Sequence, residues 1–146
     1  MAAPKAHVFI FSLIAASIVY GTNARAHHSF GAEYDSQRSV TVTGVVTKIE
    51  WTNPHCHFYV DVADEQGTVV NWKFEGYGIG PLYRNGWKRD VTMKAGDRVT
   101  VTGWRARDGG PWAHSREITL PNGQKMFFGP PAGTGEGGNA PAVEVK

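Results

Sequence analysis

The sequence predicts an all-β domain, a small five- to six-stranded OB-like barrel with one short helix between strands three and four. From Val40 onward, short runs of β-branched and aromatic residues are separated by Gly, Asn and Pro, which is typical of short strands joined by turns. The alternation stops between Gly76 and Gly86, where Pro81 suits the first turn of a helix. The expected order of elements is three strands, a helix and two or three further strands, which is the order found in an OB barrel. A small β-sandwich is the alternative fold.

We expect a long first strand over residues 39–51. Its inward positions begin with Val40 and Val42 and then change parity, with Gly44 at the change. A bulge or sharp coil at Gly44 would restore one inward face. The later inward positions would then be Val45, Ile49 and Trp51.

The next two strands should form a hairpin around the turn at residues 64–67. Residues 55–62 alternate cleanly, so the second strand turns Phe58, Val60 and Val62 inward. The same pattern in the third strand turns Val70, Trp72 and Phe74 inward and Asn71, Lys73 and Glu75 outward. Since alternation also turns Cys56 inward, we expect its thiol to be buried.

The remaining elements follow from their turn residues. A helix over 82–85 would plug one end of the barrel, and strand four over 98–104 would bend at Gly103. Strand five covers 112–120, and Pro121-Asn122-Gly123 predicts a hairpin into a last strand over 126–128. Residues 129–146 are rich in Gly, Pro and Ala, so we expect a disordered tail that cannot repay its ordering entropy.

Residues 1–26 have the organisation of a secretory signal peptide. Lys5 precedes an apolar run over 8–20, which is too short to span a bilayer, and Ala24-Arg25-Ala26 resembles a cleavage site. We therefore expect removal of 1–26, an N-terminal arm over 27–38, a β domain over 39–128, and a periplasmic or secreted location.

The expected cleavage changes the charge of the protein. The formal charge is +2, and residues 1–26 carry two basic residues and no acidic one, so the remaining chain has no net charge. Nucleic-acid binding then has no electrostatic support. Cys56 is the only cysteine in the sequence, so the chain can form no internal disulfide.

Cleavage before His27 would create a terminus that can bind metal. The α-amine and the imidazole of His27 would chelate one ion, and further imidazoles would complete the nitrogen set that copper(II) favours. His55 and His57 lie at i and i+2 on an expected strand, so they would share a face. The candidate metal ligands are His27, His55 and His57, with copper as the expected ion.

Structural roles for the same residues remain open. His27 and His28 would then be a solvated terminus, and His55 and His57 would decorate the wet face of a sheet. His114 we expect to be a hydrogen-bonded structural histidine, and the five Trp residues to fill the core. Glu75 and Asp61 are outward acids on neighbouring strands, but nothing in the sequence fixes their spacing.

Several short motifs together resemble the DUF6152 type of family, small exported bacterial proteins of uncharacterised function. The resemblance spans about residues 26–128 and implies export and a single domain, with no established activity, cofactor or partner. The His-His-Ser start and Asn-Pro-His match His27, His28 and His55, whereas His57 stands where the family more often has an apolar residue. The motifs are His27-His28-Ser29-Phe30, Trp51-Thr52-Asn53-Pro54-His55, Glu75, Gly86-Trp87, Gly96-Asp97 and Asp108-Gly109.

We therefore expect an exported binding protein, rather than an enzyme, that holds copper through the N-terminal histidine chelate. The alternative is a metal-free envelope interaction module that binds a peptide or a glycan of an envelope partner on the barrel face. A copper enzyme would also require an open coordination position and a substrate groove, which the sequence does not indicate.

Overall fold

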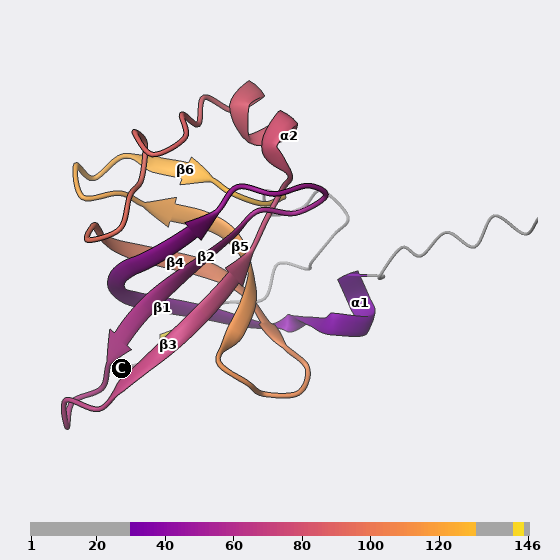
Figure 1. Cartoon of the computed structure of the whole chain (residues 1–146). Coiled ribbons are helices and arrows are strands. Elements are labelled where there is room, and N and C mark those ends of the chain that lie inside the picture. The colour runs from indigo at the N-terminus through magenta and orange to yellow at the C-terminus, as the bar shows by residue number, and fades with distance from the viewer. Residues whose placement is uncertain (1–29, 131–141, 145–146) are drawn as a thin grey trace, which may run out of the picture.

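The structure is a computed structural model that describes residues 30–130 and 142–144 (Figure 1). In chain order, its elements are α1 (Phe30–Glu33), β1 (Tyr34–Glu50), β2 (His57–Ala63), β3 (Val69–Glu75), α2 (Ile79–Arg84), β4 (Arg98–Ala106), β5 (Trp112–Thr119), β6 (Lys125–Phe127) and β7 (Ala142–Glu144).

Five strands close into a ring. β1 pairs antiparallel with both β2 and β4, and Val45 pairs with residues of both strands, so the two partners occupy opposite edges of β1. β2 pairs antiparallel with β3, β3 runs parallel to β5, and β5 pairs antiparallel with β4. This closure confirms the OB-like barrel and excludes the two-sheet sandwich.

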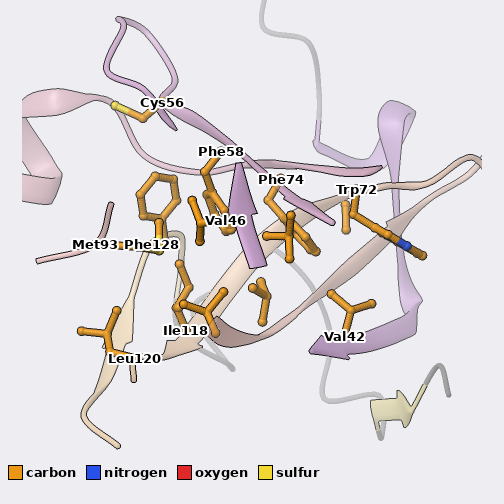
Figure 2. Close-up of a cluster of buried hydrophobic side chains, with 14 of the residues drawn as sticks. Val42, Val46, Cys56, Phe58, Trp72, Phe74, Met93, Ile118, Leu120 and Phe128 are labelled. Atoms are coloured by element: carbon orange, nitrogen blue, oxygen red, sulfur yellow. The ribbon is translucent and has the colours of Figure 1, made fainter. Parts of the chain in front are cut away.

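The barrel interior is filled by aliphatic side chains from β1, β4 and β5 and by a group of aromatic rings (Figure 2). Phe58 stacks on Phe74 with ring centroids 5.0 Å apart, and Phe128 meets Phe58 edge-on at 4.9 Å. Such pairs add about 0.5–1.5 kcal/mol beyond the free energy of burying the rings. Leu82 of α2 is fully buried in the same cluster, so α2 covers one end of the barrel.

The prediction that β1 changes parity at Gly44 is wrong. The inward positions continue from Val42 through Gly44 to Val46, while Val45 is 37% exposed. The register with β2 shifts between Val46 and Lys48 instead. A Cβ on Gly44 would lie 2.2 Å from the carbonyl oxygen of Asp61, so glycine is needed for the close approach of β2.

Other boundaries differ in smaller ways. His55 and Cys56 precede β2 instead of belonging to it, although Cys56 is buried as expected. Val70 is exposed, because it lies near the turn end of β3, where the hairpin extends past the core. Two elements start before their predicted first residues: α2 at Ile79 and β1 at Tyr34, the latter inside the stretch expected to be an arm.

The described C-terminal residues include strands at both ends of the stretch after β5. β6 pairs antiparallel with β5, as the Pro121-Asn122-Gly123 turn indicates. Gly129 and Pro130 are buried, and β7 pairs in parallel with β1. These residues depart from the expected disordered tail over 129–146, of which 131–141 and 145–146 lie outside the described residues.

Candidate functional site

A row of three ionisable side chains crosses β2, β3 and β5. His57 pairs in register with Glu75, and Glu75 pairs in register with His114. Their sequence neighbours Phe58, Phe74 and Ala113 all belong to the core. Because side chains alternate along a strand, the row lies on the outer face of the barrel.

His55 joins this row from the loop before β2. The Thr52 hydroxyl donates a hydrogen bond to the His55 carbonyl at 2.7 Å, and the Asn53 side-chain oxygen accepts one from the Ile79 N–H at 3.0 Å. The Cys56 N–H donates to the Tyr77 carbonyl at 3.0 Å, which holds the loop against the segment before α2. In this position His55 Nδ1 contacts Glu75 Oε1.

Glu75 is the centre of the site. Its Oε2 accepts a hydrogen bond from the Tyr34 hydroxyl at 2.8 Å and lies 3.7 Å from His57 Nε2. Burial by itself raises the pKa of Glu75, but the contacts with His57 and Tyr34 and the charges of His55 and His114 outweigh it and lower the pKa to about 2. The carboxylate is therefore ionised at neutral pH and attracts cations.

Tyr34 and His114 belong to a second, outer group of rings, which we call the aromatic cluster: Phe30, Tyr34, Trp104, Trp112 and His114. The ring centroids of Phe30 and Tyr34 lie 5.3 and 5.2 Å from that of His114, both at steep angles. Burial, with the hydrogen bond to Glu75, raises the pKa of Tyr34, so its hydroxyl remains a donor.

His114 is enclosed by the aromatic cluster and is 8% exposed. Burial lowers its pKa to about 4 despite the nearby Glu75 charge. The burial agrees with the predicted structural role, but the buried Nδ1 of His114 has no hydrogen-bond partner, so the predicted hydrogen bond is absent at this nitrogen. His114 is therefore a buried neutral imidazole beside the site.

The aromatic cluster also fastens the N-terminal end of the described chain. Phe30, the first described residue, packs edge-on against Trp104 at 5.3 Å. The Arg107 guanidinium donates to the Gly31 carbonyl at 2.7 Å, and the Arg107 N–H donates to the Glu33 carbonyl at 3.0 Å. Phe30 therefore lies next to His114.

The structure brings two of the three predicted metal ligands together. His55 and His57 meet at Glu75, whereas His27 lies outside the described residues, as does His28. Within 30–130 and 142–144, no group of three or more His, Cys, Asp or Glu side chains is arranged to hold a metal ion. The two histidines would therefore need a further ligand.

Glu75 is absent from the ligand set that the sequence predicts. The available signal is its outward position beside His57 across the expected hairpin, in the residue pair farthest from the hairpin turn. The other outward acid, Asp61, accepts a hydrogen bond from Asn71 at 2.7 Å farther along the hairpin, so the two acids form no carboxylate pair. Four of the five Trp residues are buried as expected, and Trp112 is half-buried.

Comparisons with known proteins identify the family. The N-terminal domain of PriB protein from Thermoanaerobacter tencongensis, described as dimeric, is 20% identical, with a TM-score of 0.42 over 57% of this chain and 94% of that one. No curated protein gives a significant match. In the part of the chain that the structure describes, no helix is long and apolar enough to cross a membrane. The model of DUF6152, a family of unknown function, matches residues 15–114, and the chain therefore belongs to this family.

Proposed function

We propose that the protein is an exported binding protein that holds copper(II) through His27, His55 and His57. The observation that carries this proposal is the convergence of the His55 and His57 imidazoles on the single carboxylate of Glu75. The two rings come from a loop and a strand, yet one nitrogen of each, His55 Nδ1 and His57 Nε2, lies close to this carboxylate. Neutral imidazoles are good ligands for copper(II), and an ionised carboxylate favours a cation beside them.

Glu75 supports this use of the two histidines. Carboxylates beside metal-binding histidines commonly orient the rings through hydrogen bonds and raise their basicity. The Tyr34 hydroxyl donates a hydrogen bond to the Glu75 carboxylate at 2.8 Å, and the Glu75 side chain is only 13% exposed. Glu75 is therefore held in place beside both imidazole rings. We infer that it orients both rings, so that the ion would bind the other nitrogen of each ring, Nε2 of His55 and Nδ1 of His57.

His27 would supply the remaining nitrogen ligands. If residues 1–26 are removed, His27 carries a free α-amine and an imidazole that chelate one ion. His27 lies three residues before Phe30, and three residues span about 10 Å when extended. Phe30 touches His114, the strand neighbour of Glu75, and His57 lies one strand farther along the row, so the two strand spacings of about 4.8 Å each fall within this reach.

The charge of the protein suits a metal ion better than a polyanion as the ligand. Without residues 1–26 the chain has no formal net charge, which gives nucleic acid no long-range attraction. The charge at the centre of the site is negative, which also suits a cation. The proposed role is binding of the ion, without chemistry on a substrate.

A competition titration tests the proposal. Protein that begins at His27 would be titrated with copper(II) against a chromogenic chelator, together with His55→Ala, His57→Ala and His28→Ala variants. We expect His55→Ala to weaken binding at least tenfold, His57→Ala to weaken it less, and the matched control His28→Ala to bind as the parent does. Equal affinity in the parent and the His55→Ala variant would contradict the proposal.

A further inference from the structure

The first half of β1 has an edge that the closed barrel does not cover. β4 pairs with one edge of β1 along Ser39–Val45, and β2 pairs with the other edge only from Val45 to Glu50. On the β2 side, residues before Val45 therefore lie beyond the end of that ladder. An open strand edge of this kind presents unpaired N–H and C=O groups to any extended chain.

β7 occupies part of this open edge. Ala142, Val143 and Glu144 pair in parallel with Ser39, Val40 and Thr41, respectively. β7 is not a member of the β1-β2-β3-β5-β4 ring, so the barrel closes without it. The edge is thus able to accept a short parallel strand, and a strand from the same chain shows the register.

β7 belongs to the same chain as the barrel but does not follow its last strand directly. Eleven residues, 131–141, separate it from Pro130, the last described residue of the barrel. Covalent linkage raises the effective concentration of a short strand, on the order of 1 mM for short linkers, and the β7 ladder has only three residue pairs. A strand that pairs over more of the β1 edge would displace it.

We propose that the β1 edge at Ser39–Thr41 is a strand-addition site for an extended peptide segment of a partner protein, and that β7 is its tethered competitor. Strand addition to a sheet edge recognises the peptide backbone, with side chains adding specificity. The segment would run parallel to β1, with a β-branched residue opposite Val40, as Val143 is. This site is separate from Glu75 and does not depend on metal binding.

The test uses the full chain and a Val143→Pro variant, because proline removes a ladder N–H and disfavours strand pairing. A fluorescent peptide of residues 139–146 would be titrated into both proteins and followed by anisotropy. We expect Val143→Pro protein to bind the peptide at least tenfold more tightly than the parent, since its own β7 no longer competes. An Asn139→Pro chain, with the same residue placed before β7, should behave as the parent.

Hydrogen exchange gives a second readout on the same samples. The amides of Ser39–Thr41 that face β7 should exchange faster in the Val143→Pro chain and slow again when the peptide is added. A peptide carrying Val143→Pro should neither bind nor restore protection. Equal peptide affinity for the parent and the Val143→Pro chain, or exchange at Ser39–Thr41 that does not respond, would overturn the proposal.

Discussion

His114 should make the protein lose stability in mild acid. Its pKa is lowered from 6.5 to about 4 in the folded state, mainly by burial. A histidine with a lowered folded pKa contributes stability above its unfolded pKa, and this contribution is lost as the pH falls toward the folded value. The window is therefore about pH 6.5 to 4, and the protein should lose stability on acidification within it.

The shift from 6.5 to about 4 sets the size of this effect. Complete loss of the His114 contribution lowers the free energy of unfolding by about 3 kcal/mol. About 2 kcal/mol of this should already be lost at pH 5 relative to pH 8. Glu75 interferes little there, because its own contribution is lost only below about pH 4.5.

Urea denaturation at pH 8 and pH 5, followed by Trp fluorescence, measures the difference. The variants His114→Phe, which keeps a ring in the aromatic cluster, and His114→Gln, which keeps a polar group, both lack the titrating imidazole. Each should lose about 2 kcal/mol less than the parent between the two pH values. If both variants lose as much stability as the parent, His114 does not cause the acid sensitivity.

Further predictions concern the carboxylate, the β1 glycine, the thiol and the arm. Glu75→Gln should remove the stability that the parent loses between about pH 4.5 and 2, visible as a flatter acid denaturation profile. Gly44→Ala should lower the free energy of unfolding, measured by urea denaturation, by more than about 2 kcal/mol, because the added Cβ would meet the Asp61 backbone. The control Gly31→Ala, whose added Cβ has no atom within 4 Å, should lower it by less than about 0.5 kcal/mol. Burial raises the pKa of Cys56, so its thiol should react with a disulfide reagent only after unfolding; fast labelling of native protein would refute this. Phe30→Ala should weaken copper(II) binding by protein that starts at His27 and leave protein with an extra N-terminal residue unchanged, as measured by chelator competition.

The fold was predictable where local pattern and burial agree. Phe58, Val60 and Val62 alternate with polar residues, and all three are buried. The predicted change of parity at Gly44 is wrong, because a sequence does not show that the carbonyl oxygen of a neighbouring strand lies 2.2 Å from where a Cβ on this residue would be. Val70 was misplaced for a related reason, since only the three-dimensional structure shows where the hairpin leaves the core.

The site was predictable only in part. The spacing of His55 and His57 indicated that they act together, although His55 reaches Glu75 from a loop and not from the strand. Glu75 and Tyr34 are 41 residues apart, and their hydrogen bond depends on the extension of β1 back to Tyr34. Pairing between such distant segments has no signal in one sequence, because it follows from the register of strands around the barrel.

The proposed function depends on His27, as the first residue, and His55 binding the same copper ion. Electron paramagnetic resonance of the copper(II) complex tests it most directly, with protein that begins at His27 compared with the same protein carrying one additional N-terminal alanine. We expect resolved nitrogen hyperfine structure from several nitrogen ligands in the first protein and a spectrum with fewer nitrogen couplings in the second. Identical spectra from the two proteins would contradict it.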